Sequence, residues 1–453
     1  MLEVNKYFKK NKTAIFVSVW LLLVLMGSIF FYVRYQYAYN NANFFAEDGV
    51  VFFRNITIHG ALDAMFTLFN GYLVTGQYVL TGIAIVLNSI FGRGLETMPK
   101  AMAVVSYVFL GFISSLPFLL FRKKLGYLLA TMTAILLWVV PLGGYDYTVI
   151  GTICNLKFSF FFIAALLIIY RNQKDLVDKK WQFIIIDLTL LLCVITNILT
   201  IALLPFLFWR YKNGIIETIN NRAIKKLSAA QISAAFLVLL TILYLLLIAF
   251  RHTKSMPGYL DEPLMFGSII NIFSRGSIYG LLFPVNNLLN DYIVIFFFIV
   301  SIVAALLSRY RAELLFIWYA IFINVAGFVY NRTGVTHMFS TYASDGGPGL
   351  FFYAGTMLFV FGVAYSTQDW FRRQKIVSKI ILAALAIGFI MVSLPTAGSR
   401  GASYTNIISK RPTISAEIIR VCANASDENV EIGIYPSVEW TLTVERRIAC
   451  TRD

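Results

Sequence analysis

The residues best suited to chemistry are two adjacent carboxylates, Glu47 and Asp48, within residues 43–50 (NFFAEDGV). They stand between aromatic residues and a glycine, directly after the first apolar run that is long enough to cross a membrane. A carboxylate beside hydrocarbon has a raised pKa unless a cation pairs with it, so it can accept a proton near neutral pH. The alternative is that both acids only keep a loop beside the membrane hydrated.

The elements that must position this pair are membrane helices. The 453-residue chain is 59% hydrophobic and 13% charged, whereas a soluble domain carries about 25% charged residues. Apolar runs able to cross about 30 Å of hydrocarbon recur along the chain, and the first, residues 13–32, is too long for a cleaved signal. The net charge of +15 comes from Lys and Arg grouped between these runs, which is typical of cytoplasmic loops and not of a nucleic-acid-binding surface.

The sequence therefore predicts an all-α polytopic membrane protein with about eleven transmembrane helices in residues 1–394. Lysines near the start place the N-terminus in the cytoplasm, so the acid pair and the C-terminus face the other side. The substantial loops predicted on that outer side are 33–70, 251–291 and 331–349. The runs predicted to span after the first one are 71–91, 101–121, 125–143, 150–170, 182–209, 229–250, 292–307, 314–330, 350–366 and 377–394.

Two basic loops conflict with this simple count. Residues 122–124 (RKK) and 171–180 would face outward, against the rule that positive charge stays inside. Both become cytoplasmic if 182–209 forms two half-helices and one of the two runs between 71 and 121 is re-entrant. Residues 51–70 are apolar but interrupted by charge, which predicts one or two short helices in the membrane interface.

Basic side chains on the outer side predict an anion site. Positive charge resists translocation, so its retention in outward loops indicates a bound anion such as phosphate. The alternative is anchoring of Arg and Lys among phospholipid head groups. Loop 331–349 adds hydroxyls and a Gly-Gly-Pro-Gly turn, which is typical of a ligand-lining loop. The candidate binding residues are Arg54, His59, Tyr72, Arg251, His252, Lys254, Arg332, His337, Tyr342 and Asp345.

Residues 395–453 are predicted to form a small α/β domain on the outer side. Residues 413–423 are expected to be helical, and 430–435 and 441–446 to be strands. Cys422 and Cys450 would lie in an oxidising compartment, where a disulfide could staple the domain or both could remain free thiols. The spacing of Cys and His shows no metal site.

The arrangement of these parts resembles the GT-C fold of polyprenyl-phosphate-sugar glycosyltransferases. The sequences FAEDG (45–49), NGY (70–72), Tyr435-Pro436 and Trp440 resemble serotype-converting O-antigen glucosyltransferases more narrowly. The topological likeness covers most of the chain, and the sequence likeness is confined to these motifs. The family would have a basic residue shortly after Asn-Gly-Tyr, where Gln77 stands here.

This resemblance implies transfer of a sugar, such as glucose, from a polyprenyl-phosphate donor to a hydroxyl of a cell-surface polysaccharide such as O-antigen. The reaction would occur on the periplasmic face of a bacterial inner membrane, among membrane lipids. Asp48 is the first choice as base, because flexible Gly49 follows it, and Glu47 would hold acceptor hydroxyls; attack in a single step inverts the anomeric carbon. The phosphate leaves readily once neutralised, so no cofactor is required, although a divalent metal stays possible.

Two other functions fit parts of the pattern. A transporter or flippase for a lipid-linked or anionic solute would place ionisable groups inside its spans, and Asp187 is the clearest acid within an apolar run. No internal repeat accompanies it. A polymerase-type ligase would use diphosphate-linked donors and an Arg-rich outer loop, but loop 251–291 contains only two arginines.

Overall fold

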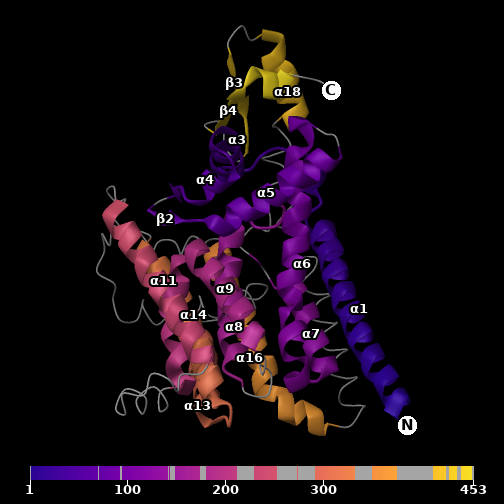
Figure 1. Cartoon of the computed structure of the whole chain (residues 1–453), viewed down its shortest axis with the longest axis vertical. Helices are drawn as coiled ribbons and strands as arrows, with labels where there is room; N and C mark the ends of the chain where they lie inside the picture. The colour runs from indigo at the N-terminus through magenta and orange to yellow at the C-terminus, as the bar shows by residue number, and fades with distance from the viewer. Residues whose placement is uncertain are drawn as a thin grey trace.

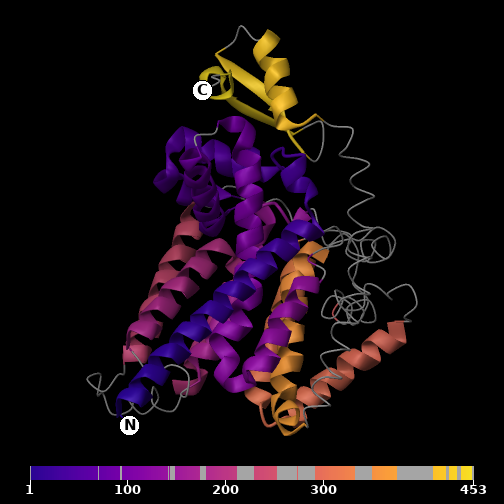
Figure 2. The ribbon, with the colours of Figure 1, turned by 90° about the vertical axis from the view of Figure 1, so that its right-hand side faces the viewer.

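The protein is a bundle of long helices that carries a small C-terminal domain at one end (Figure 1). Figure 2, turned by 90°, shows the same separation, with α1 running diagonally along the bundle. We call the end that holds the N-terminus basal, and the opposite end, which holds residues 37–48, apical. The computed structural model describes residues 2–69, 71–91, 94–140, 142, 148–173, 180–211, 229–251, 273, 291–331, 349–374, 412–424, 428–435 and 440–450.

The elements of the bundle occur in this order. The α-helices are α1 (Leu2–Arg34), α2 (Tyr37–Asn40), α3 (Arg54–His59), α4 (Ala61–Met65), α5 (Thr75–Ile90), α6 (Met98–Leu125), α7 (Tyr127–Val139), α8 (Lys157–Arg171), α9 (Lys180–Thr196), α11 (Ala229–Arg251), α13 (Asp291–Leu307), α14 (Arg311–Asn331) and α16 (Gly349–Arg373). Between them lie a π-helix η1 (Asp48–Phe53), the 3₁₀ segments η2 (Leu95–Thr97), η4 (Cys154–Leu156) and η5 (Ile198–Tyr211), and the hairpin strands β1 (Leu68–Phe69) and β2 (Tyr72–Leu73).

The two long helices α1 and α6 run antiparallel. Near the basal end the indole of Trp20 donates to the Ser115 hydroxyl at 2.9 Å, and the Arg122 guanidinium lies 3.3 Å from the centre of the Phe16 ring. Near the apical end the Tyr107 hydroxyl donates to a main-chain carbonyl just after α1. Helix α6 therefore begins at the apical end, and α5 must lie there too instead of crossing the bundle (Figure 1).

This arrangement places the basic residues 122–124 at the same end of the bundle as the N-terminus (Figure 1). The predicted span 71–91 contains only the 16-residue helix α5, which follows β2 at the apical end. Residues 122–124 lie at the basal end, where Arg372 of α16 donates to the carbonyl oxygens of Lys123 and Lys124. The structure does not establish run 71–91 as a span, because α5 is a shorter apolar helix at the end where α1 ends and α6 starts.

The long run 182–209 also divides in two. Helix α9 ends at Thr196, and η5 begins two residues later. The Thr196 hydroxyl accepts from the backbone N–H of Gly76 at 2.8 Å, which places this turn at the apical end. Asn172, just after α8, donates to the Phe206 carbonyl at 3.1 Å, which returns η5 to the basal end.

Four segments in the described part of the chain are long and apolar enough to cross a membrane: Ala14–Arg34, Leu95–Leu125, Cys154–Arg171 and Gln231–Phe250. The expected number of about eleven is not established by these four, and run 377–394 lies outside the described residues. Large apolar side chains are exposed along α1, α11 and α13. Such faces are unfavourable in water and suit contact with lipid.

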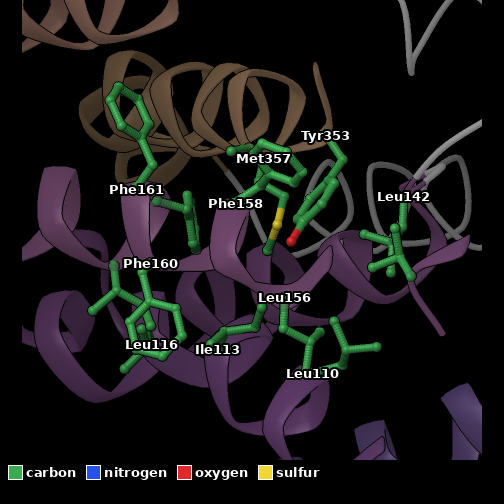
Figure 3. Close-up of a cluster of buried hydrophobic side chains, with 14 of the residues drawn as sticks. Leu110, Ile113, Leu116, Leu142, Leu156, Phe158, Phe160, Phe161, Tyr353 and Met357 are labelled. Atoms are coloured by element: carbon green, nitrogen blue, oxygen red, sulfur yellow. The ribbon is translucent and has the colours of Figure 1, made fainter. Parts of the chain in front are cut away.

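The core beneath the apical end packs α8 between α6 and α16. Figure 3 shows Leu110, Ile113 and Leu116 facing Leu156 and Phe160 on one side of α8, with Met357 and Tyr353 on the other. The Tyr353 hydroxyl shares a 2.7 Å hydrogen bond with the Ser159 hydroxyl and donates to the Asn155 carbonyl at 3.2 Å. The start of α8 is thereby fixed by apolar packing and by hydrogen bonds.

The C-terminal domain has the predicted elements. Helix α18 (Ile414–Asn424) packs on the antiparallel strands β3 (Asn429–Gly433) and β4 (Thr441–Glu445), and α19 (Arg446–Cys450) follows. Cys422 and Cys450 form a disulfide that joins α18 to α19. Because so small a unit buries little apolar surface, this staple supplies much of its stability.

Candidate functional site

The acid pair lies at the apical end, and Asp48 holds the start of the α8 segment. Its two carboxylate oxygens accept the backbone N–H groups of Cys154 at 2.7 Å and Ile153 at 2.9 Å. These donors stand 105 and 106 residues further along the chain. Asp48 therefore acts as a distant N-terminal cap for η4 and α8, where the helix dipole also favours a negative charge.

Burial dominates the electrostatics of Asp48. The residue is 2% exposed. Desolvation raises its pKa from 3.8 to about 7, against the lowering effect of the two backbone hydrogen bonds; Glu47 raises it further. At about 1.4 kcal/mol per pKa unit, the charged form costs the folded state about 4 kcal/mol. A buried acid with a raised pKa is a marker of a functional site, and such acids also occur in structural hydrogen-bond networks.

Glu47 differs from its neighbour in exposure. It is half-buried, whereas Asp48 is buried. The preceding residue, Ala46, has a left-handed φ of 41°, a backbone conformation that residues with a side chain rarely adopt. This turn directs the two successive acids differently, with Asp48 toward the interior and Glu47 nearer the surface.

A cation that the sequence reasoning missed stands at the start of α8, the helix that follows the two N–H groups bound by Asp48. Lys157 begins α8, and its ammonium group is 5.9 Å from the centre of the Phe69 ring. Lys157, Asp48 and Glu47 all act electrostatically on the Cys154 thiol, which shows that they share one neighbourhood. The available signal was a lone lysine near the start of the predicted span 150–170.

Gln77 is a structural residue. With its amide oriented to satisfy both ends, it donates to the Val74 carbonyl at 3.0 Å and accepts the backbone N–H of Lys157 at 2.9 Å. It thus joins the start of α5 to the start of α8. Lys157, from another part of the chain, lies with its ammonium group 5.9 Å from the ring of Phe69 on β1.

The other predicted binding residues are only partly placed. Arg54 and His59 lie on α3, directly after η1; Arg54 is half-buried and His59 is exposed. Tyr72 is half-buried on β2, and Arg251 ends α11. The hydroxyl of Tyr244, also on α11, accepts the backbone N–H that follows Tyr72, so both elements meet at the apical end. His252, Lys254, Arg332, His337, Tyr342 and Asp345 lie outside the described residues.

Asp187, the candidate intramembrane acid of a transporter, is neutralised by a neighbour. Arg171 forms a bidentate ion pair with it, at 2.7 and 2.9 Å, and is completely buried. Arg171 also donates to the Ser233 hydroxyl at 3.2 Å. This geometry is typical of an ion pair that fastens α8, α9 and α11 together.

Across the ranges that the structure describes, no group of three or more His, Cys, Asp or Glu side chains is arranged to hold a metal ion. Comparison with protein-family models, curated proteins and solved structures found no match to this chain.

Proposed function

We propose that the protein is a membrane glycosyltransferase that moves a sugar from a polyprenyl-phosphate donor to a hydroxyl of a cell-surface glycan. The observation that carries the proposal is the acid pair at the apical end. Asp48 is buried and fixed by two backbone N–H groups, Glu47 before it is half-buried, and Lys157 begins the helix that follows those N–H groups. A proton acceptor beside a cation suits attack by an alcohol with departure of a phosphate.

The distribution of charge supports an outward orientation for this site. The basic N-terminus, residues 122–124 and the pair Arg372 and Arg373 lie at the basal end. Positive residues of short loops stay in the cytoplasm, so the basal end would face inward and the acid pair outward. In a bacterial inner membrane, the reaction would take place on the periplasmic side.

Exposure assigns different roles to the two acids. The base must come within about 3 Å of the acceptor hydroxyl, and Glu47 is the member of the pair that a ligand can reach. We therefore move the role of base from Asp48, the first choice from sequence, to Glu47. Asp48 becomes a positioning residue, since both its oxygens already bind backbone N–H groups.

The proposed reaction is a single displacement. The carboxylate of Glu47 takes the proton of the acceptor hydroxyl while the hydroxyl oxygen bonds to the anomeric carbon. The bond from that carbon to the phosphate oxygen breaks, and its electron pair leaves with the polyprenyl phosphate, whose added charge Lys157 stabilises. Attack opposite the leaving group inverts the anomeric carbon.

The test measures sugar transfer from a radiolabelled polyprenyl-phosphate glucose in membranes that contain O-antigen acceptor. Glu47→Gln keeps the shape of the side chain but removes the base, so we expect a loss of about a hundredfold or more. Asp63→Asn, which neutralises an exposed acid of α4 at the same end, is the matched control and should retain activity. Full activity of Glu47→Gln would exclude Glu47 as the base. Movement of the labelled lipid-linked sugar across the membrane, without formation of a bond between the sugar and the acceptor, would contradict the enzyme proposal.

A further inference from the structure

The C-terminal domain is bound directly to the acid loop, which we define as residues 42–48. The backbone N–H of Ala46 donates to the Tyr435 carbonyl at 2.6 Å, and the Tyr435 N–H donates to the Phe44 carbonyl at 3.0 Å. This pair of bonds forms a parallel β-bridge that extends the end of β3 onto the loop. The contact joins two segments nearly 400 residues apart beside the acid pair.

Asn43 reinforces the same contact through its side chain. Its amide nitrogen donates to the Gly433 carbonyl at 3.2 Å and to the Pro412 carbonyl at 3.3 Å. Its amide oxygen accepts the backbone N–H of Phe44 at 2.8 Å, which is a local turn contact. One side chain therefore joins the acid loop both to the residues just before α18 and to the end of β3.

The contact is close as well as hydrogen-bonded. A methyl group added at Gly49 would lie 2.9 Å from Cβ of Phe44 and 3.1 Å from Cδ1 of Ile434. The only non-glycine residue with a left-handed φ in the described part of the chain is Ala46, and its N–H is the group that bonds to the domain. A conformation of this kind persists only where surrounding contacts impose it.

The C-terminal domain is built rigidly enough to impose it. The Glu417 carboxylate accepts the backbone N–H of Gly433 at 3.0 Å and pairs with Arg420 at 2.7 Å, which fixes α18 against β3. The disulfide between Cys422 and Cys450 fixes α18 against α19.

We propose that the C-terminal domain holds the acid loop in its working geometry, with Asn43 as the main side-chain positioning residue. The predicted effect on sugar transfer rests on the proposed glycosyltransferase function, whereas the contact between the domain and the loop does not. Since Ala46 directly precedes Glu47, release of the domain would let the turn relax and move the carboxylate away from the acceptor. Asp48 would stay on the N–H groups of Ile153 and Cys154, so chemistry would slow while the donor site, on α8 and the β1–β2 hairpin, stayed intact.

The experiment compares Asn43→Asp with Asn40→Asp in the full-length protein. Asp at position 43 keeps the oxygen that accepts the N–H of Phe44. It replaces the amide nitrogen, which donates to the C-terminal domain, by an oxygen that faces the carbonyls of Pro412 and Gly433. Asn40 is exposed on α2 and receives the same change of charge, so it is the matched control. Asn43→Ala removes the donor without repulsion and serves as a second variant if the first fails to insert.

We expect hydrogen–deuterium exchange of the peptide 42–50 to become about thirtyfold faster in Asn43→Asp, because two hydrogen bonds of ordinary net strength are lost. Exchange in α6 and α8 should not change. The kcat for sugar transfer should fall about tenfold to a hundredfold with an unchanged KM for the donor.

Two results would overturn the inference: unchanged exchange of peptide 42–50, or faster exchange with a kcat within twofold of Asn40→Asp. Faster exchange in a protein whose unaltered form transfers no sugar would contradict the glycosyltransferase proposal alone and would support the contact between the domain and the loop.

Discussion

The raised pKa of Asp48 predicts that the folded protein loses stability as the pH rises toward neutrality. The folded state holds this proton up to about pH 7, whereas the unfolded chain releases it near pH 3.8. Between these values the folded state binds more protons, so the free energy of unfolding decreases with rising pH. From pH 5 to pH 8 the two pKa values give a decrease of about 3 kcal/mol from this one group.

Asp48→Asn isolates that contribution, because the amide does not titrate. Other ionisable groups affect the mutant and the unaltered protein alike, so the difference between their pH profiles belongs to Asp48. One backbone N–H, from Ile153 or Cys154, would then face the amide nitrogen, which lowers stability by about 1–3 kcal/mol at acidic pH. Near pH 8 this loss is offset because the variant buries no charge.

The assay is thermal unfolding of both proteins in detergent between pH 5 and pH 8, with Asp63→Asn as a control for removing an exposed acid of the same region. We expect the unaltered protein and the control to lose stability over this range, and Asp48→Asn to lose about 3 kcal/mol less. Parallel profiles for all three proteins would show that Asp48 stays charged throughout, and would refute the argument from burial.

Two further predictions concern charges elsewhere in the bundle. Lys157→Met should raise the KM for the donor about tenfold or more, because a charged contact to the donor phosphate is lost. Lys157→Arg keeps the charge and should have a KM near that of the unaltered protein. A KM of Lys157→Met equal to that of the unaltered protein would show that Lys157 is not part of the donor site. Arg171→Met or Asp187→Leu alone should destabilise the protein by about 3–5 kcal/mol in thermal unfolding, and the double variant should recover most of that loss. Sugar transfer per folded molecule should be preserved in the double variant, since Arg171 and Lys157 stand at opposite ends of α8, about 21 Å apart along the helix. Loss of transfer in the double variant would favour the transporter alternative.

The burial of Asp48 also explains why activity alone is a poor test of its role. Its replacement removes a carboxylate that fastens the start of α8, so a loss of transfer could come from displacement of Lys157. Glu47 makes no such contact in the described hydrogen-bond network, which makes Glu47→Gln the cleaner experiment. The three-way comparison of Glu47→Gln, Asp48→Asn and Asp63→Asn separates proton transfer from positioning.

The broad class and the local elements could be predicted from the amino-acid pattern alone. Long apolar runs with basic residues between them have few solutions other than membrane helices, because lipid offers no partners for a free backbone. The short helices after residue 50, the C-terminal helix and strand pair, and the candidate cysteine pair all follow from local pattern. The adjacent acids were recognisable because carboxylates beside a span are costly unless something uses them.

How these parts meet depends on long-range packing, which local pattern does not encode. Run 71–91 is apolar enough to span, but its place at the apical end depends on the pairing of α1 with α6, which no local pattern encodes. Lys157 and the two N–H groups that hold Asp48 come from more than 100 residues away, and the C-terminal domain from nearly 400. Glu47 and Asp48 differ in burial, and burial is a property of the packed chain.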